Sequence, residues 1–390
     1  MKLYKIFTGD CIAGMSKMPA QSVHTCITSP PYYELRDYGV EGQHGNETLL
    51  SSYIEKMVEV FAAVWRVLRD DGTLWLNIGD TYADNSNKKD GLKAKDLMGV
   101  PWRVALALQA AGWYLRQDII WHKPNTMTES CDDRCVKSHE YIFLLTKKPA
   151  YFFDFEAIRE KTGNEMSWDD YIKLLQNNQS EGNEDWYARP PGRWGGESGG
   201  DADSGQVYGK GHKAVTATHP NGRGKRSVWT VPVGSYKGAH FATFPPKLIL
   251  PCILAGTSKK GACPDCGAPW VREVESIRIP TRSGKSGKGA MKKDQQEARG
   301  GFGRSSVFLD PKRHVTATRT IGWQPGCACS ATGRVPCTVL DPYLGSGTTV
   351  AVAVQYGRRG VGCELNPEYV KLARERIEAA VNNVGFGLLG

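Results

Sequence analysis

The hydrophobic pattern is clearest between residues 53 and 78. Apolar side chains recur at helical spacing over residues 53–68, and Asp70-Asp71-Gly72 follows as a stop signal. Residues 73–78 are then almost continuously apolar, as in a strand that is buried on both faces. A helix with one apolar stripe followed by such a strand predicts an α/β fold with a doubly wound, mostly parallel sheet.

The same alternation continues on both sides of this pair. Strands are expected at residues 3–9, 22–27, 117–121, 140–145, 338–340 and 360–363, and helices at 101–111, 168–177, 244–255, 350–354 and from 367 to 380. Between residues 156 and 238 the pattern dissolves into Gly, Asn, Ser, Arg and Trp, for example at 189–196. Loops of this length are usually functional or disordered. We interpret residues 156–238 as a target-recognition region, with a disordered insertion as the alternative.

The segment Thr28-Ser29-Pro30-Pro31-Tyr32 follows the strand expected at 22–27. Two prolines fix φ twice and remove two backbone donors, so the chain leaves the strand in one rigid shape with free carbonyl groups. Such carbonyls accept hydrogen bonds from an amino group, Ser29 adds a hydroxyl, and Tyr32 offers a ring for base stacking. The alternative is a strand that ends in a proline turn.

Near the other end of the chain, Asp341-Pro342-Tyr343-Leu344-Gly345-Ser346-Gly347-Thr348-Thr349 joins a strand to a helix. Glycines at this place let the backbone approach a ligand closely. A phosphate loop would need Lys after the last glycine, where Thr348 stands, so ATP is disfavoured. Glu364 ends the next strand, 19 positions after Gly345, where an acidic residue can accept both hydroxyls of a ribose.

These two motifs resemble those of DNA amino-methyltransferases, whose catalytic pattern is Asp, Asn or Ser followed by Pro-Pro and an aromatic residue. The order, catalytic motif first and cofactor loop last, is that of the β-class of bacterial and phage enzymes, a circular permutation of the methyltransferase fold. The resemblance implies S-adenosylmethionine as cofactor and double-stranded DNA as substrate. The residues that it assigns to catalysis are Ser29, Pro30, Pro31 and Tyr32; those assigned to the cofactor are Asp10, Thr28, Phe244, Asp341, Tyr343, Gly345, Ser346, Gly347, Thr348 and Glu364.

By this resemblance Asp10 holds the adenine amino group of the cofactor, with a turn aspartate as the alternative, and Asp341 faces its ammonium group. The acceptor is the exocyclic amino nitrogen of a flipped base. The resemblance slightly favours N6 of adenine over N4 of cytosine, because the cysteine-containing insertion is similar to that of solitary and phage-borne adenine enzymes. An RNA methylase or an inactive DNA-binding protein is less favoured. Pro336-Cys337 precedes the cofactor loop and is interpreted as core, not as a carbon-5 methylase nucleophile.

Four cysteines predict a structural zinc site. Cys263 and Cys266 flank a knuckle turn, and Cys327 and Cys329 form a second pair, which suits tetrahedral zinc; ordinary reduced thiols are the alternative. Cys131 and Cys135 are a weaker pair. A basic, glycine-rich tract at 281–293 lies between the zinc pairs, and we expect either a solvated loop or a segment that follows DNA phosphates.

Composition agrees with these predictions. The chain has 390 residues, 40% of them apolar, and 50 basic against 41 acidic side chains give a formal net charge of +9, which favours a polyanionic partner. No apolar run is long enough to span a membrane and no signal peptide opens the chain, so a cytoplasmic location in a bacterial or phage-infected cell is expected. A homodimer is left open. The predicted parts are the catalytic half (1–155), the target-recognition region (156–238), a cofactor-lining helix (239–258), the zinc-knuckle and basic insertion (259–335) and the cofactor half (336–390).

Overall fold

The structure is a computed structural model that describes residues 3–84, 91–126, 129–163, 165–177, 219–234, 244–280 and 314–383. Its contacts divide the chain into two units. The first comprises Met1–Arg159, Gly224–Arg272 and Trp323–Gly390, and the second Glu160–Arg223 and Glu273–Gly322. Residues 224–238, which the sequence analysis assigned to the target-recognition region, therefore group with the first unit.

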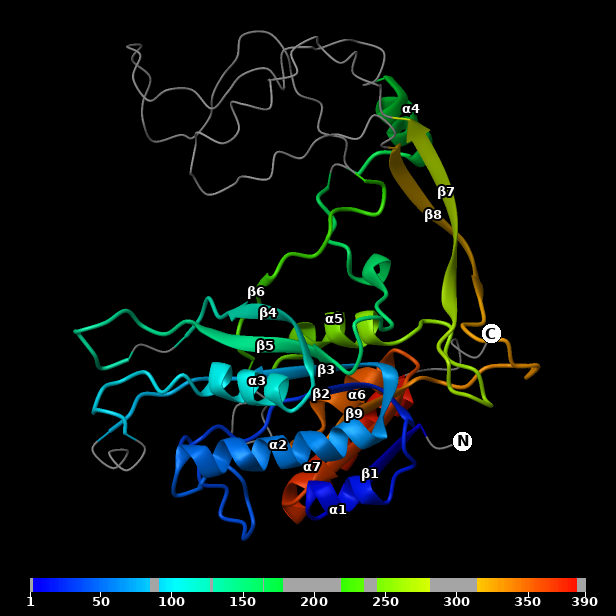
Figure 1. Cartoon of the computed structure of the whole chain (residues 1–390). Helices are drawn as coiled ribbons and strands as arrows, with labels where there is room; N and C mark the ends of the chain where they lie inside the picture. The colour runs from blue at the N-terminus through cyan, green and yellow to red at the C-terminus, as the bar shows by residue number, and fades with distance from the viewer. Residues whose placement is uncertain are drawn as a thin grey trace, which may run out of the picture. The chain divides into compact units, whose positions relative to one another are not determined.

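The first unit is built on an eight-stranded sheet with the order β1-β10-β9-β2-β3-β5-β4-β6 (Figure 1). All neighbouring pairs are parallel except β3–β5 and β5–β4, so the predicted α/β fold with a mostly parallel sheet is confirmed. The strands are β1 (Tyr4–Thr8), β2 (Val23–Thr28), β3 (Leu68–Ile78), β4 (Tyr114–His122), β5 (His139–Thr146), β6 (Val228–Thr230), β9 (Thr338–Asp341) and β10 (Arg359–Glu364).

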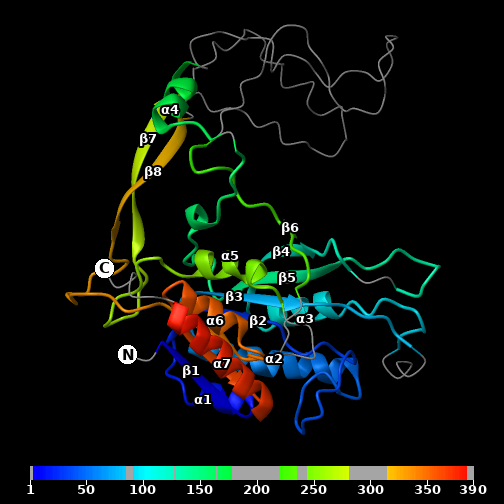
Figure 2. The same ribbon diagram turned by 180° about the vertical axis from the view of Figure 1, so that it is seen from behind.

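Helices cover both faces of this sheet. One core cluster joins the sheet to α1 (Cys11–Ser16), α2 (Leu50–Val67) and α3 (Val100–Ala110). Two further clusters join it to α5 (Pro246–Gly256), α6 (Thr348–Gln355) and α7 (Pro367–Asn383). Figures 1 and 2 show α5 on the side of the strands away from α2. The predicted helices and strands of this unit therefore exist, with boundaries shifted by a few residues.

The junction between α2 and β3 corrects one prediction. Residues 70–72, expected to form a turn, lie inside β3, which starts at Leu68 directly after the last residue of α2. The charged residues at this strand start have partners, because Lys147 and Lys148 form ion pairs with Asp70 at 3.2 and 2.8 Å. Paired charges allow an extended conformation where unpaired ones would favour a solvated turn.

Several other elements were not predicted, among them α1 and three strands. β6 lies within the region expected to be irregular, and it adds a parallel strand beside β4. β7 (Val271–Pro280) and β8 (His314–Gln324) form a separate two-stranded sheet. The tract 281–293, which lies between them in the sequence, is outside the described residues. The second unit contains most of these two strands, the predicted helix α4 (Trp168–Asn177) and a bridge between Glu160 and Arg223.

The strand directions bring distant segments together. The carboxyl ends of β1, β2, β3, β4, β9 and β10 and the amino end of the antiparallel β5 lie at one edge of the sheet. In open α/β sheets ligands bind at this edge. Among the helices described here, none combines the length and the apolar character that a membrane span requires.

Candidate active site

A cleft with a volume of about 410 Å³ lies at the carboxyl edge of the sheet. That volume is in the range of small-molecule sites. Its lining includes most of the predicted site residues: Asp10, Ser29, Pro30, Pro31, Tyr32, Phe244, Asp341, Tyr343, Gly345, Ser346, Thr348 and Glu364. The two motifs, which are about 300 residues apart in sequence, therefore share one cavity.

Asp341 ties the two motifs together. Its carboxylate, at the end of β9, accepts hydrogen bonds from the hydroxyls of Thr28 and Thr349, both at 2.7 Å, and from the amide of Tyr343 at 3.1 Å. Burial raises the pKa of Asp341 to about 6. Thr28, predicted as a cofactor residue, is fully buried and instead fixes Asp341 and the end of β2.

Two residues of the glycine loop have a backbone conformation that favours glycine. Gly345 and Gly347 have φ of +52° and +84°, which a side chain would strain. A Cβ at Gly347 would lie 3.0 Å from Ala373 of α7, so this glycine serves close packing and does not line the cleft. Arg376 donates to the hydroxyls of Ser346 at 2.9 Å and Thr348 at 2.6 Å and thereby orders the loop.

Glu364 stands at the end of β10 and is held by the backbone. Its two carboxylate oxygens accept hydrogen bonds from the amides of Gly345 at 2.7 Å and Asn366 at 2.9 Å. Burial raises the pKa of this carboxyl. Each oxygen keeps a further lone pair, so both can accept another hydrogen bond from a ligand in the cleft.

Asp10 and Tyr343 complete this side of the cleft. Asp10 is the N-cap of α1, because its Oδ1 accepts from the amide of Ala13 at 2.8 Å, as the turn alternative required, and it also lines the cavity. The hydroxyl of Tyr343 lies 2.6 Å from Nδ1 of His44. The sequence analysis did not include His44, which comes from the loop between β2 and α2.

The Pro-Pro segment leaves β2 and enters the cleft. The carbonyl of Pro31 accepts from the hydroxyl of Tyr53 at 2.9 Å, whereas in the described part of the chain the carbonyl of Pro30 has no hydrogen-bond partner. The hydroxyl of Ser29 donates to that of Tyr32 at 3.3 Å. The ring of Tyr32 packs on Gly79, where a Cβ would approach it to 2.6 Å.

Three polar residues of this side were missed. Asn77, Lys123 and Glu140 come from β3, from the residue after β4 and from β5, and all three line the cleft. The hydroxyl of Tyr32 donates to Glu140 at 2.6 Å. Two features of the sequence could have indicated them. Glu140 begins the apolar run 140–145, and Lys123 stands just past the end of a strand.

The four predicted zinc ligands lie together. One sulfur each from Cys263, Cys266, Cys327 and Cys329 is within 4.8 Å of the others. Tetrahedral zinc at about 2.3 Å from each thiolate requires sulfur separations of about 3.8 Å, so the cluster fits the ion with small adjustments. Cys131 and Cys135 are not part of this cluster, and Cys337 is buried in the core as expected.

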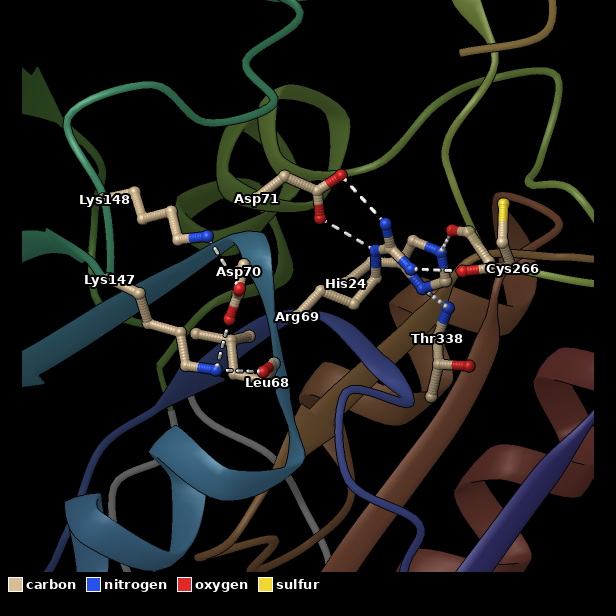
Figure 3. A network of polar contacts seen from close by, with 10 residues as sticks. His24, Leu68, Arg69, Asp70, Asp71, Lys147, Lys148, Cys266 and Thr338 are labelled. Atoms are coloured by element: carbon tan, nitrogen blue, oxygen red, sulfur yellow. Dashed lines mark hydrogen bonds and ion pairs between the residues drawn. The ribbon is translucent and has the colours of Figure 1, made fainter. Parts of the chain in front are cut away.

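The knuckle turn is anchored to the amino ends of β2 and β3 (Figure 3). Arg69 forms a two-pronged ion pair with Asp71 and donates to the carbonyl of Cys266 at 2.7 Å. His24 accepts from the amide of Thr338 through Nδ1, and its Nε2 lies 2.9 Å from the carbonyl of Gly267. The ring proton is therefore on Nε2, and burial, which lowers the pKa of His24 to about 4, keeps the ring neutral.

Comparison with known proteins agrees with the fold and identifies the family. A family model described as DNA methylase, of the N6/N4 methyltransferases, matches residues 23–266 and 337–375. The type II methyltransferase M.XycI of Xanthomonas campestris pv. cyanopsidis is 34% identical over 97% of this chain and 89% of its own length. M.Cfr9I of Citrobacter freundii is 33% identical over the same shares.

Among solved structures, PvuII DNA methyltransferase (cytosine-N4-specific) superposes with a TM-score of 0.51 at 14% identity, covering 98% of this chain and 92% of that one. The family match, which spans both sequence motifs, and the two type II relatives give the class as DNA methylase. The chain belongs to the N6/N4 DNA methylase family and is an S-adenosylmethionine-dependent DNA amino-methyltransferase.

The buried imidazole of His24 yields a stability prediction. His24→Phe leaves an amide and a carbonyl without partners in the interior, so we expect the free energy of unfolding to fall by about 2 to 4 kcal/mol. Urea denaturation followed by circular dichroism measures it. Lys148→Ala, which removes an exposed ion pair of the same network, should change it by less than about 0.5 kcal/mol. Equal midpoints for wild type and His24→Phe would contradict the assigned hydrogen bonds.

Proposed function

We propose that the cleft holds S-adenosylmethionine beside β9 and β10 and a flipped base beside β2, β3 and β5. The observation that carries this proposal is the bond between Thr28 and Asp341, which places the Pro-Pro segment next to the glycine loop. In the sequence the Pro-Pro segment precedes the glycine loop by about 300 residues, and in the structure β2 pairs with β9. These two observations support the circularly permuted arrangement. A methyl donor and an amino acceptor bound in this way would be neighbours.

The residues beside β9 and β10 suit S-adenosylmethionine, which when bound supplies an electrophilic methyl group. We assign Glu364 to the ribose hydroxyls, because its oxygens are fixed by two amides and face the cleft. Asp341 is assigned to the ammonium group and Asp10 to the adenine amino group. Phe244, Tyr343, Gly345, Ser346 and Thr348 line the remaining wall. Thr28 and Gly347 support the site through packing and hydrogen bonds.

On the other side, the carbonyl of Pro30 and the hydroxyl of Ser29 are assigned to the amino group of the base. Accepting its hydrogen bonds turns the nitrogen lone pair toward the methyl donor. Pro31 is assigned to rigidity, since its carbonyl is already bonded to Tyr53. Tyr32 lines the cleft and is assigned to the flipped base. The motif alone accommodates adenine or cytosine, with the slight preference for adenine resting on the resemblance of the cysteine-containing insertion.

Double-stranded DNA is the substrate of this reaction, and we assign its sequence recognition to residues 156–238. The net charge of +9 favours DNA phosphates. The arginine-rich stretch at 189–196 and the basic tract at 281–293 lie outside the described residues. The homodimer stays a prediction.

The proposal is tested by separating catalysis from binding. Tyr32→Ala and Ser29→Ala should lower methyl transfer to DNA steeply, since lost base stacking alone is worth about 1 to 3 kcal/mol, roughly five- to 150-fold. Transfer is measured with labelled S-adenosylmethionine, and cofactor and duplex affinities at one salt concentration. Both affinities should hardly change.

Tyr114→Ala, which alters an exposed tyrosine, is the matched control and should leave all three values unchanged. If Tyr32→Ala and Ser29→Ala both transfer methyl groups at the wild-type rate, the Pro-Pro segment is a proline turn without a catalytic role.

The raised pKa of Asp341 predicts pH-dependent cofactor binding. Below about pH 6 the free protein carries a proton on Asp341 that an ammonium group must displace. Affinity for S-adenosylmethionine should therefore level off about one pH unit above the pKa of Asp341 and fall by up to tenfold per pH unit below that pKa. Calorimetry between pH 5 and 7 measures this slope. Asp341→Asn should bind more weakly and reduce the slope; an unchanged slope would assign the titration to another group, such as Glu364.

We also propose that the four-cysteine cluster binds one structural zinc ion. Purified protein should contain about one zinc per chain by elemental analysis, and Cys263→Ser with Cys266→Ser should remove it. Cys131→Ser with Cys135→Ser is the matched control and should retain the metal, because these thiols lie outside the cluster. If wild-type protein purified without a chelator contains no metal, the four cysteines are ordinary thiols and the zinc proposal is wrong.

A further inference from the structure

Glu140 is the centre of a polar cluster in the base side of the cleft. Its Oε2 accepts from the hydroxyl of Tyr32 at 2.6 Å and from the amide of Asn77 at 3.0 Å, and its Oε1 is paired with the ammonium of Lys123. The side chains of Lys123 and Glu140 are only 17% and 13% exposed. This cluster belongs to neither sequence motif, yet it lines the same cavity.

The residues of this cluster differ in how many further hydrogen bonds they can form. Glu140 already binds three donors, and the amide of Asn77 uses its second N–H on the carbonyl of Tyr141 at 3.1 Å. Lys123 has three N–H groups, and Glu140 is its one ion-pair partner among the described residues. The ammonium is also held 4.5 Å above the ring of Trp121. A fixed ammonium with spare donors therefore faces the cavity.

A donor at this place distinguishes the two candidate bases. Along its Watson–Crick edge cytosine presents the amino group, the acceptor N3 and the carbonyl oxygen O2. Adenine presents its amino group, the acceptor N1 and then an apolar C–H. If the amino group lies at Ser29 and Pro30, a cationic donor at the far end of this edge has a partner at O2 of cytosine and none at the corresponding carbon of adenine.

We propose that Lys123, oriented by Glu140, is a specificity residue that donates to the O2 carbonyl of the flipped base, and that the base is therefore cytosine, methylated at N4. This inference rests on the proposed function, because it needs a base bound with its amino group at the Pro-Pro segment. It reverses the slight preference for adenine that the motif resemblance gave. Glu140 acts as a positioning residue for both Lys123 and Tyr32.

The identity of the product tests the base. Whole-genome-amplified bacterial DNA carries no enzymatically methylated bases and contains short recognition sequences of every kind, so it is a suitable substrate. After incubation with the full-length wild-type protein and S-adenosylmethionine, nucleosides are separated and identified by mass. N4-methylcytosine is expected. N6-methyladenine would overturn the inference and leave the proposed function intact, whereas DNA without a methylated amino group would overturn both.

The role of Lys123 is tested by substitution in the same assay. Lys123→Met should lower kcat/KM for DNA about ten- to a hundredfold, as loss of one charged hydrogen bond to a base implies, while affinity for S-adenosylmethionine stays unchanged. Lys123→Arg keeps a donor and should recover part of the loss. Lys148→Met, at the opposite edge of the sheet, is the matched control and should have wild-type kinetics. A wild-type kcat/KM for Lys123→Met, or a loss that follows reduced cofactor affinity, would remove Lys123 from base recognition.

Discussion

The buried carboxylate of Asp341 is the constraint on which the active site depends. A carboxylate in the interior is costly unless hydrogen bonds satisfy it, and here the donors come from the end of β2, from α6 and from the loop itself. These three segments can therefore be placed in only one way relative to β9. Because Thr28 immediately precedes Ser29, the bond that satisfies Asp341 also fixes where the Pro-Pro segment starts. The segments proposed for catalysis and for cofactor binding are joined by the hydrogen bonds that this one buried carboxylate requires.

The sheet carries different chemistry on its two edges. The carboxyl ends of its parallel strands form the cleft, and the amino ends hold the knuckle through His24 and Arg69 (Figure 3). β2 has a role at both edges, since His24 is its second residue and Thr28 its last, and all six of its residues are buried. A short strand that is fully buried cannot shift independently of its neighbours, because protein interiors are closely packed. The knuckle and the Pro-Pro segment are thus attached to opposite ends of the same strand.

Sequence reasoning succeeded where neighbouring residues carry the signal. The helices and strands of the sheet, the Pro-Pro segment, the glycine loop and the cysteine pairs all depend on local spacing, and the structure brings each set together. It failed where the signal is only spatial: β6 is three residues long and depends on β4 for its pairing, and residues 70–72 extend because distant lysines pair with Asp70. Asn77, Lys123 and Glu140 are single polar residues from three strands, so nothing in the linear order connects them.

Tyr32 shows what the spatial cluster adds to the motif. The motif predicts an aromatic ring for the base, but not what holds that ring in place. Its hydroxyl is bonded to Glu140 and its ring rests on Gly79, and these two contacts fix its rotamer. A preordered ring loses less conformational entropy on binding than a mobile one, so more of the stacking energy is available to hold the extruded base. Because Glu140 also holds Lys123, the ring proposed to stack on the base and the ammonium proposed to donate to its edge share one support, a single carboxylate.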